Sequence, residues 1–262
     1  MKYLFDDWDK IAAAARTFFH ILLLLDYDGT TVPIQRAPEK ARLDEETRQL
    51  LRKLSGHPKV TLGIISGRSI SDIASMVGLN GLIYTGNHGL EIWLPGKPVE
   101  RLYGEETLQV IRNIQKELKG QLGDIKGVLI EDKGPIMAIH YRMARGDTNE
   151  VILKAVRGLV SKNPGLAMRQ GKMVVEITPD IPFNKGMTVK WLLDNLFPEE
   201  RPIVVFAGDD LTDEDAFAML DEGDVSIYVG LRPNHFSARY YTKDSSGIRQ
   251  FLYELENVLN VS

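Results

Sequence analysis

The 262-residue sequence contains no cysteine. A disulfide framework, a thiolate nucleophile and a cysteine-ligated zinc site are therefore excluded, and the absence suits a reducing cytosol. A long apolar run is also missing, because the longest one near the N-terminus, residues 21–25, is too short to span a bilayer. Neither a signal peptide nor a membrane anchor is expected, and we predict a cytoplasmic protein with no membrane partner.

An excess of positive charge is absent as well. The net charge of -4 argues against broad contact with the phosphate backbone of nucleic acid, so no nucleic-acid partner is expected. The 44% of hydrophobic and 26% of charged residues are ordinary for a globular protein, and the length allows one or two domains.

Apolar runs and helical spacings alternate along both ends of the chain. Short continuous apolar runs predict buried strands at 21–25, 60–65, 82–84, 203–207 and 225–229, the last of the chain. Helical spacing predicts helices at 44–54, with Asp44 as N-cap, and at 71–77, 185–196 and 213–220. Strands that alternate with helices are typical of a doubly wound, Rossmann-like parallel α/β sheet.

The middle of the chain has a different pattern. It predicts helices at 105–118 and 149–160, strands at 128–133 and 136–142, and two more strands within 168–177. We therefore predict a core made by residues 1–103 and 180–262, with a smaller inserted α+β domain at 104–179.

The segment Asp26-Tyr27-Asp28-Gly29-Thr30 follows the first predicted strand. Ligand sites of α/β sheets lie beyond the carboxyl ends of strands. Two carboxylates two residues apart repel each other, and a divalent cation would compensate. The alternative is a simple turn after a strand.

Three further segments lie at corresponding places. Ser66 could bind a phosphoryl oxygen or only cap the next helix. Lys185 lies in the first turn of its predicted helix, where a positive charge is unfavourable to the helix macrodipole. A nearby anion would explain a lysine there, and the alternative interpretation is a solvated surface lysine. Asp209 and Asp210 precede a helix and carry the hard oxygens that Mg²⁺ selects, although acidic residues also favour helix N-termini in general.

In this order, the segments resemble the haloacid-dehalogenase-like phosphatases and, within them, the trehalose-6-phosphate phosphatase family. The resemblance covers nearly the whole chain and is carried by short motifs that begin at Asp26, Ser66, Gly86, His140, Val175, Asn184 and Gly208. One departure is Thr31, where the family more often has leucine, and we expect it to alter packing and leave the chemistry unchanged.

The resemblance implies a catalytic mechanism. Asp26 is expected to attack phosphorus and form an aspartyl-phosphate, and Asp28 to act as general acid and base. The Mg²⁺ ion is expected to be held by Asp26, the backbone carbonyl of Asp28 and Asp209, with Asp213 or Asp210 acting directly or through water. The expected phosphate-binding residues are Ser66, Gly67 and Lys185.

The resemblance also implies that the inserted domain is a cap that selects the substrate. The expected substrate-binding residues are Arg68, Asn87 and His88 in the core and Glu131, Arg142 and Glu176 in the cap, with Lys133 as a further candidate. The alternative for the cap residues is a solvated strand face. For His88 the alternative is a structural histidine.

The function implied is Mg²⁺-dependent hydrolysis of the small-molecule sugar phosphate trehalose 6-phosphate to trehalose and phosphate. One alternative is another glycosyl phosphate, such as a glucosylglycerol or mannosylglycerate phosphate. A second is a catalytically silent regulatory partner of a synthase, which would have lost at least one of Asp26, Asp28, Lys185 and Asp209; all four are present. No synthase-sized region precedes residue 20, so we expect a freestanding phosphatase that could associate with a separate trehalose-phosphate synthase.

Overall fold

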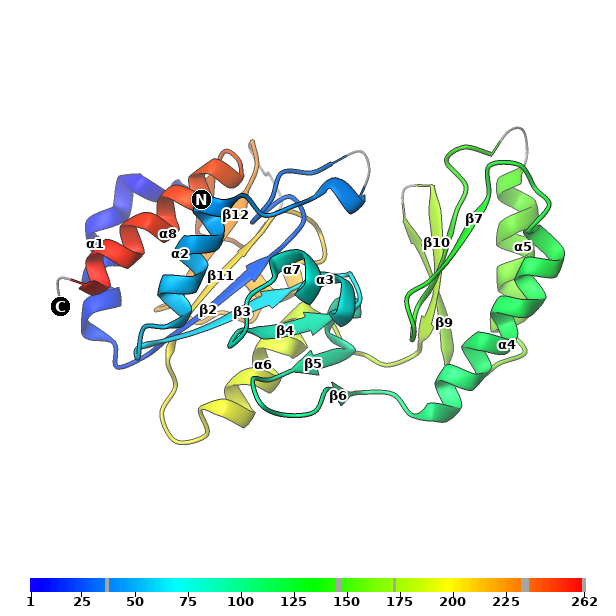
Figure 1. Ribbon diagram of the computed structural model, residues 1–262, viewed down its shortest axis with the longest axis horizontal. Helices are drawn as coiled ribbons and strands as arrows, with labels where there is room; N and C mark the ends of the chain where they lie inside the picture. The colour runs from blue at the N-terminus through cyan, green and yellow to red at the C-terminus, as the bar shows by residue number, and fades with distance from the viewer. Residues whose placement is uncertain (36–37, 145–147, 172, 232–235, 261–262) are drawn as a thin grey trace. The chain divides into compact units, whose positions relative to one another are not determined.

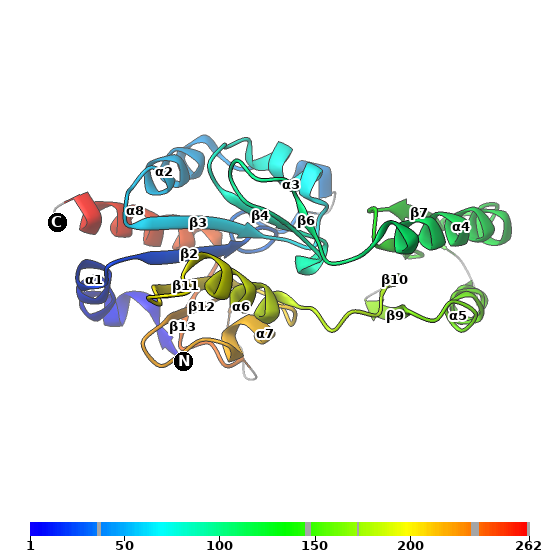
Figure 2. The same cartoon turned by 90° about the horizontal axis from the view of Figure 1, so that it is seen from below.

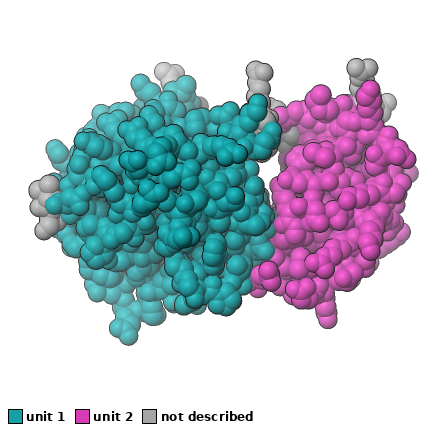
Figure 3. Space-filling view, viewed as in Figure 1, with its two compact units in different colours: residues 1–100, 183–262 teal, residues 101–182 magenta. Residues whose placement is uncertain are grey.

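The chain forms two compact units, which Figure 3 distinguishes by colour. The computed structural model describes residues 1–35, 38–144, 148–171, 173–231 and 236–260. Unit 1 comprises Met1–Glu100 and Phe183–Ser262, and unit 2 comprises Arg101–Pro182. The sequence places these boundaries at 103/104 and 179/180, and the catalytic and substrate-selecting roles of the two parts remain predictions.

Unit 1 is organised around one large sheet (Figure 1). Among the described residues, its strands follow in the order β1 (Lys2–Tyr3), β13 (Tyr240–Thr242), β12 (Val225–Val229), β11 (Ile203–Gly208), β2 (Ile21–Asp26), β3 (Val60–Ile65), β4 (Ile83–Gly86), β5 (Glu91–Trp93) and β6 (Glu100–Arg101). The pairs from β1 to β4 are parallel, whereas β5 runs antiparallel to β4. The central strands β2 and β11 therefore end at the same edge of the sheet.

The run Ile-Leu-Leu-Leu-Leu of β2 is apolar throughout because both faces of the sheet are covered. Leu23 and Leu25 pack in a core with residues of α1 (Trp8–Thr17), α2 (Glu45–Ser55), α3 (Ile70–Val77) and α8 (Ser245–Asn260). Leu22 and Leu24 pack in a second core with α6 (Lys185–Leu196) and α7 (Glu214–Ala218). Figure 2 shows α2 and α3 on one side of the sheet and α6 and α7 on the other. Short 3₁₀ helices are η1 (Leu4–Asp7), η2 (Pro38–Lys40) and η3 (Asn87–Gly89).

Unit 2 is a four-stranded antiparallel sheet with two helices. The strand order among the described residues is β7 (Leu129–Asp132), β8 (Met137–His140), β10 (Val174–Pro179) and β9 (Leu166–Gly171). The helices α4 (Glu105–Leu122) and α5 (Thr148–Val160) share one apolar core with the sheet, which includes Ile139, Val175 and Ile177. One face of this sheet is therefore covered by helices.

The predicted fold class is confirmed, since a parallel α/β core is joined to a smaller α+β unit. Asp44 caps α2 as predicted, accepting from the Thr47 amide at 2.8 Å. Several details were wrong: α4 extends to Leu122 and α1 and α8 were not predicted, and three further differences are instructive. α3 begins at Ile70 and is capped by Ser69, α7 ends at Ala218 in place of residue 220, and β12 is not the last strand because β13 follows it.

These errors have physical causes. The cap of α3 is one of several nearby serines, and only the backbone conformation decides which one accepts the helical amide. At the end of α7 the Met219 amide donates to Ala216 in a tighter turn that sequence spacing does not reveal. β13 has three residues, too few for an alternating pattern to be recognised.

Candidate active site

Acidic side chains gather at the carboxyl edge of the unit 1 sheet. Asp26 is the last residue of β2 and Asp209 follows the end of β11. The two strands are parallel neighbours, with Leu25 registered opposite Ala207. The carboxyl ends of parallel strands form the usual ligand-binding edge of such a sheet. The fold therefore brings together two segments that lie more than 180 residues apart in the chain.

Tyr27 anchors the loop between the two aspartates of the first motif. Its ring is fully buried in the core and its hydroxyl donates to the Ala41 carbonyl at 2.8 Å. Burial raises the pKa of Tyr27 to about 12, to which the charge of Asp28 adds, so the hydroxyl stays protonated. Thr31 donates to the backbone carbonyl of Asp26 at 2.6 Å. The threonine at position 31, where the family more often has leucine, thus adds a hydrogen bond to the backbone of Asp26.

Lys185 connects the acidic residues. Its ammonium donates to Asp26 Oδ1 and to Asp213 Oδ1, each at 2.6 Å, and the lysine side chain is only 3% exposed. Asn184 fixes the start of α6, since its side chain accepts from the Met187 amide at 2.8 Å. The alternative of a solvated surface lysine does not match this burial.

Gly186 allows α6 to approach α7. A Cβ at Gly186 would overlap the carbonyl oxygen of Asp215 at the start of α7. Only glycine lets the two backbones come this close. The small residue after Lys185 therefore places the first turn of α6 beside the acidic loop.

Asp213 organises the acidic loop. Its Oδ2 accepts from the amides of Asp209 and Asp210 at 2.9 and 3.0 Å, and its side chain is fully buried. Its Oδ1 accepts from Lys185. Oδ2 thus accepts two hydrogen bonds and Oδ1 one, which leaves one of the about four lone-pair sites of the carboxylate, at Oδ1, for a cation or a water molecule.

Asp209 packs against the first motif. Thr30 donates to Asp209 Oδ1 at 3.2 Å. Gly29 has φ of +92°, and a Cβ there would overlap the Asp209 carboxylate. A glycine is thus required at this position both by the backbone conformation and by the close carboxylate. Thr30 had no predicted role, because its contact joins residues 179 positions apart in the sequence.

The electrostatics of the cluster show a surplus of negative charge. Burial raises the pKa of Asp26 well above its usual range, Asp213 and Asp209 add to this rise, and Lys185 opposes it. Burial and the charges of Asp213 and Asp210 raise the pKa of Asp209 to about 7. Burial alone would lower the pKa of Lys185, but Asp26 and Asp213 outweigh it and raise that pKa. One buried ammonium therefore does not neutralise the carboxylates around it.

The same residues fit a divalent metal ion. Asp26, Asp209 and Asp213 each offer a carboxylate oxygen, and these oxygens lie within 4.8 Å of one another. Carboxylate oxygens are the donors that Mg²⁺ prefers, and a second cation would balance the surplus charge. The donor set and the raised pKa of Asp209 thus agree with a magnesium site.

Asp28 is held by Arg68. The guanidinium donates from Nε and Nη2 to the two carboxylate oxygens of Asp28 at 2.6 and 2.7 Å. It also contacts Asp72 at 3.2 Å, and its guanidinium carbon lies 5.9 Å from the ring centroid of Tyr27. The Asp28 side chain is 39% exposed, far more than that of Asp26. Arg68 therefore contacts the second aspartate of the motif, a pairing that the sequence did not predict.

The loop after β3 carries the other predicted core residues. Ser66 is buried, and its Oγ accepts a hydrogen bond from the Arg68 amide at 3.1 Å. The N-cap of α3 is Ser69, so the alternative of Ser66 as a helix cap is wrong. The His88 ring packs on Gly67, where a Cβ would lie 2.5 Å from His88 Cε1. Asn87 is buried and donates to Glu91 at 2.9 Å. These residues lie at the edge where Asp26 is registered opposite Ile65.

The remaining predicted residues belong to unit 2. Glu131 contacts His140 at 2.8 Å and Glu176 contacts Lys133 at 3.1 Å, whereas Arg142 lies exposed just after β8. The sequence predicted all four of these acidic and basic candidates on strands, but β7 ends at Asp132 and β8 at His140, so Lys133 and Arg142 lie just beyond their strands. Their part in substrate binding remains a prediction.

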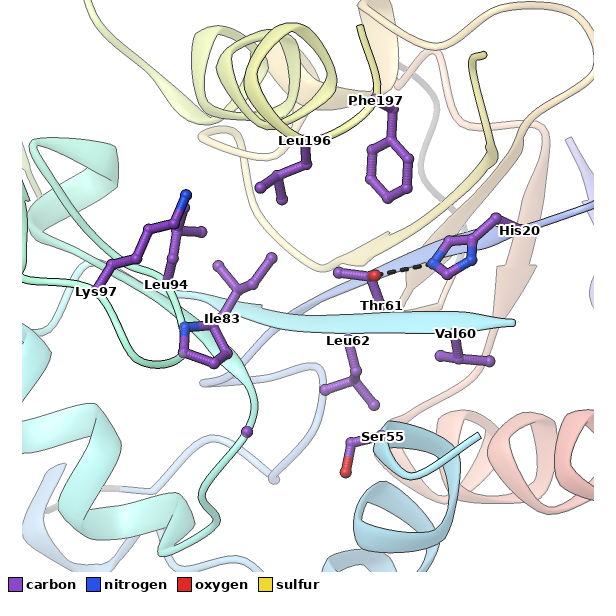
Figure 4. A pocket seen from close by; sticks show the side chains of 12 residues that line it. His20, Ser55, Val60, Thr61, Leu62, Ile83, Leu94, Lys97, Leu196 and Phe197 are labelled. Carbon is purple, nitrogen blue, oxygen red and sulfur yellow. Dashed lines mark hydrogen bonds between the residues drawn. The ribbon is translucent and has the colours of Figure 1, made fainter. Parts of the chain in front are cut away.

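A cavity of about 350 Å³ opens at the other end of the unit 1 sheet (Figure 4). It is lined at the amino ends of β2 and β3 by His20 and Thr61, which are hydrogen-bonded at 2.8 Å, and at the end of α6 by Leu196 and Phe197. No lining residue is a carboxylate. This cavity lacks the carboxylates of the acidic cluster, and the acidic cluster is therefore the better candidate for the catalytic site.

In the described part of the chain, no helix is long and apolar enough to cross a membrane.

Comparisons with known proteins show which family the chain resembles. The family model described as trehalose-phosphatase matches residues 24–246. The probable trehalose-phosphate phosphatase 3 of Oryza sativa subsp. japonica is 32% identical over 271 residues, which cover 96% of this chain and 73% of that protein. The C-terminal domain of the C. albicans trehalose-6-phosphate phosphatase superposes with a TM-score of 0.78 at 25% identity, covering 95% of this chain and 96% of that one. The C-terminal domain of a Candida albicans trehalose synthase regulatory protein shares the fold, with a TM-score of 0.66 at 14% identity and coverage of 95% and 97%.

Proposed function

The chain belongs to the trehalose-phosphatase family, and we propose that it hydrolyses trehalose 6-phosphate to trehalose and phosphate through an aspartyl-phosphate. The observation that carries the proposal is the ammonium of Lys185, which joins Asp26 to Asp213 beside Asp209 at the carboxyl edge of the sheet. A nucleophile, a fixed cation and further metal-binding carboxylates are what phosphoryl transfer requires.

In the first step, a carboxylate oxygen of Asp26 attacks phosphorus. A bond from this oxygen to phosphorus forms as the bond from phosphorus to the sugar oxygen breaks, and the leaving sugar oxygen takes a proton from Asp28. The charge of Lys185 favours the ionised, nucleophilic form of Asp26 and opposes burial, which raises the pKa of this carboxyl group. The products of this step are the free sugar and the aspartyl-phosphate.

In the second step, water attacks phosphorus of the aspartyl-phosphate. Asp28 now accepts a proton from the water, and the bond from phosphorus to Asp26 breaks to release phosphate. Both carboxylate oxygens of Asp28 accept hydrogen bonds from Arg68. An oxygen that carries a proton towards the sugar has to face the sugar, so the first step requires one of these contacts to be given up when the substrate binds.

Mg²⁺ would be held by Asp26, Asp209 and the backbone carbonyl of Asp28, with Asp213 or Asp210 acting directly or through water. When bound, it supplies positive charge that stabilises the phosphoryl oxygens during transfer. The protein's own phosphate-binding groups are Ser66, Gly67 and Lys185. An ammonium has three donors, and two of those of Lys185 contact Asp26 and Asp213, so one is left for a phosphoryl oxygen.

Recognition of the sugar is assigned to unit 2 as the cap, through Glu131, Arg142, Glu176 and Lys133. Carboxylates and cations that lie on or beside a sheet can bind the many hydroxyls of a disaccharide. Arg68, Asn87 and His88 are the proposed sugar contacts of unit 1. A cytoplasmic location and association with a separate trehalose-phosphate synthase remain predictions.

Phosphate release from a panel of sugar phosphates tests the proposal. The purified protein with Mg²⁺ is expected to have a kcat/KM for trehalose 6-phosphate at least about 100-fold above that for glucose 6-phosphate. Equal turnover of the two would reject the assignment. Faster turnover of glucosylglycerol phosphate or mannosylglycerate phosphate would assign the enzyme to that substrate, and no turnover of any ester would favour the regulatory alternative.

A further inference from the structure

Among the described residues, the helices α4 and α5 cover one face of the unit 2 sheet and leave the other uncovered. Its residues Ile139, Val175 and Ile177 point into the core shared with α4 and α5. Side chains of neighbouring positions in a strand point to opposite faces. The residues that alternate with the core positions therefore lie on the other, uncovered face.

The register of the strands aligns two carboxylates on this uncovered face. Ala138 of β8 is paired with Glu131 of β7 on one side and with Glu176 of β10 on the other. Ala138 is fully buried although it carries only a methyl group. The three paired residues Glu131, Ala138 and Glu176 thus form a row across the sheet. The row has a small apolar residue in its centre and a longer, acidic side chain on each side.

Each carboxylate of the row contacts a basic side chain. Nε2 of His140 lies 2.8 Å from Glu131 Oε2, and Lys133 Nζ lies 3.1 Å from Glu176 Oε1. His140 is two positions beyond Ala138 on the same strand, so it is a diagonal neighbour of Glu131. The side chains of His140 and Glu131 are 39% and 46% exposed, which leaves the pair accessible to a ligand.

We propose that His140 is a positioning residue that holds Glu131 in the conformation that accepts hydrogen bonds from sugar hydroxyls; the proposal rests on the proposed function. A glutamate has several rotatable bonds, and ordering it when a ligand binds opposes binding. A hydrogen bond already made to His140 removes much of this cost. An exposed pair of this kind adds little to stability, so its effect on recognition is separable from folding.

The test compares four variants of the full chain: His140→Ala, His140→Gln, Glu131→Gln and the double variant His140→Ala with Glu131→Gln. Lys154→Ala is the matched control, because Lys154 is exposed on α5, which packs on the covered face. Each protein is assayed with trehalose 6-phosphate and with p-nitrophenyl phosphate, which has no sugar.

His140→Ala is expected to raise KM for trehalose 6-phosphate about tenfold while kcat changes less than about twofold. The p-nitrophenyl phosphate kinetics and the control variant should match the wild type. His140→Gln should recover most of the loss, since its amide can donate to Glu131. In the Glu131→Gln background, the change at His140 should add almost nothing.

An unchanged KM in His140→Ala would overturn the proposal, as would equal losses on both substrates or additive effects in the double variant. If the wild type prefers another sugar phosphate, the proposed substrate is wrong, and the same variants assayed on that substrate decide the role of His140. A wild type that hydrolyses no sugar phosphate overturns both.

Discussion

The ammonium of Lys185 lies 2.6 Å from Oδ1 of Asp26, and neither side chain is more than 8% exposed. A buried carboxylate without a cation would take up a proton. The lysine therefore has two effects at once, because its charge favours the ionised form of the proposed nucleophile and its contact ties α6 to the end of β2. Its second contact, to Asp213, extends this connection to the loop after β11.

Lys185→Met should destabilise the protein and abolish activity. Removal of one member of a buried ion pair leaves an uncompensated charge, which costs about 3–5 kcal/mol of the free energy of unfolding. Urea denaturation measures the loss. Lys190→Met is the matched control on the same helix, since Lys190 is 53% exposed and its removal should change stability by less than about 0.5 kcal/mol. Equal stability of the two variants would contradict the role of Lys185.

Asp26→Asn should lose at least about a thousandfold in kcat while the fold is retained. An amide of the same shape keeps a hydrogen-bond acceptor for Lys185 but cannot form the aspartyl-phosphate. Phosphate release measures the rate, and a stable covalent adduct should be absent when the variant is treated with a phosphate mimic. Asp9→Asn, an exposed change on α1, serves as the control. Substantial activity in Asp26→Asn would remove Asp26 as the nucleophile.

The metal-free protein should lose stability as the pH rises from about 4 to 7. Burial and neighbouring carboxylates raise the pKa of Asp209 to about 7, above the value of about 3.9 in an unfolded chain. The folded state therefore binds the proton more tightly, and this contribution is complete below pH 4 and lost as the pH passes 7. Thermal unfolding in EDTA measures the slope, which Asp209→Asn should reduce and Asp194→Asn, an exposed change, should leave unchanged.

Mg²⁺ should reverse this loss. A cation bound by the ionised carboxylates stabilises the folded state by about 2.7 kcal/mol at 100 times its dissociation constant. Its effect on the melting temperature should be larger at pH 8 than at pH 5, where Asp209 is protonated. EDTA should silence the enzyme and added Mg²⁺ should restore it. Full activity in the chelator, or a melting temperature that Mg²⁺ does not change, would contradict the magnesium site.

Local sequence predicted the parts of the site but not their contacts. The apolar runs of β2, β3 and β11 identified buried strands, and the rule that ligands bind at carboxyl ends placed Asp26, Ser66 and Asp209 at one edge. The pairing of Arg68 with Asp28 joins residues 40 positions apart. No periodicity encodes such a contact, because side-chain geometry in the folded state decides it. The roles of these residues remain predictions.

The same limit applies to the acidic loop. Five acidic residues follow β11 in the sequence. The resemblance to the phosphatase family implies that Asp209 binds the metal ion, with Asp213 or Asp210 acting directly or through water. In the structure Asp213 accepts two backbone amides of its own loop. Residue types alone do not distinguish a carboxylate that binds a metal from one that folds the loop, since both need the same oxygen atoms.

Gly29→Ala should inactivate the enzyme, whereas Gly81→Ala should not. Both glycines have positive φ, +92° and +84°, so an alanine at either position strains the backbone by about 1–2 kcal/mol. Only at Gly29 would the added Cβ overlap the Asp209 carboxylate, and at Gly81 it would meet nothing within 4 Å. Urea denaturation and phosphate release together separate backbone strain from the displacement of Asp209. If both variants lose activity equally, backbone strain alone explains the effect, and if Gly29→Ala stays active, the contact with Asp209 is not needed for catalysis.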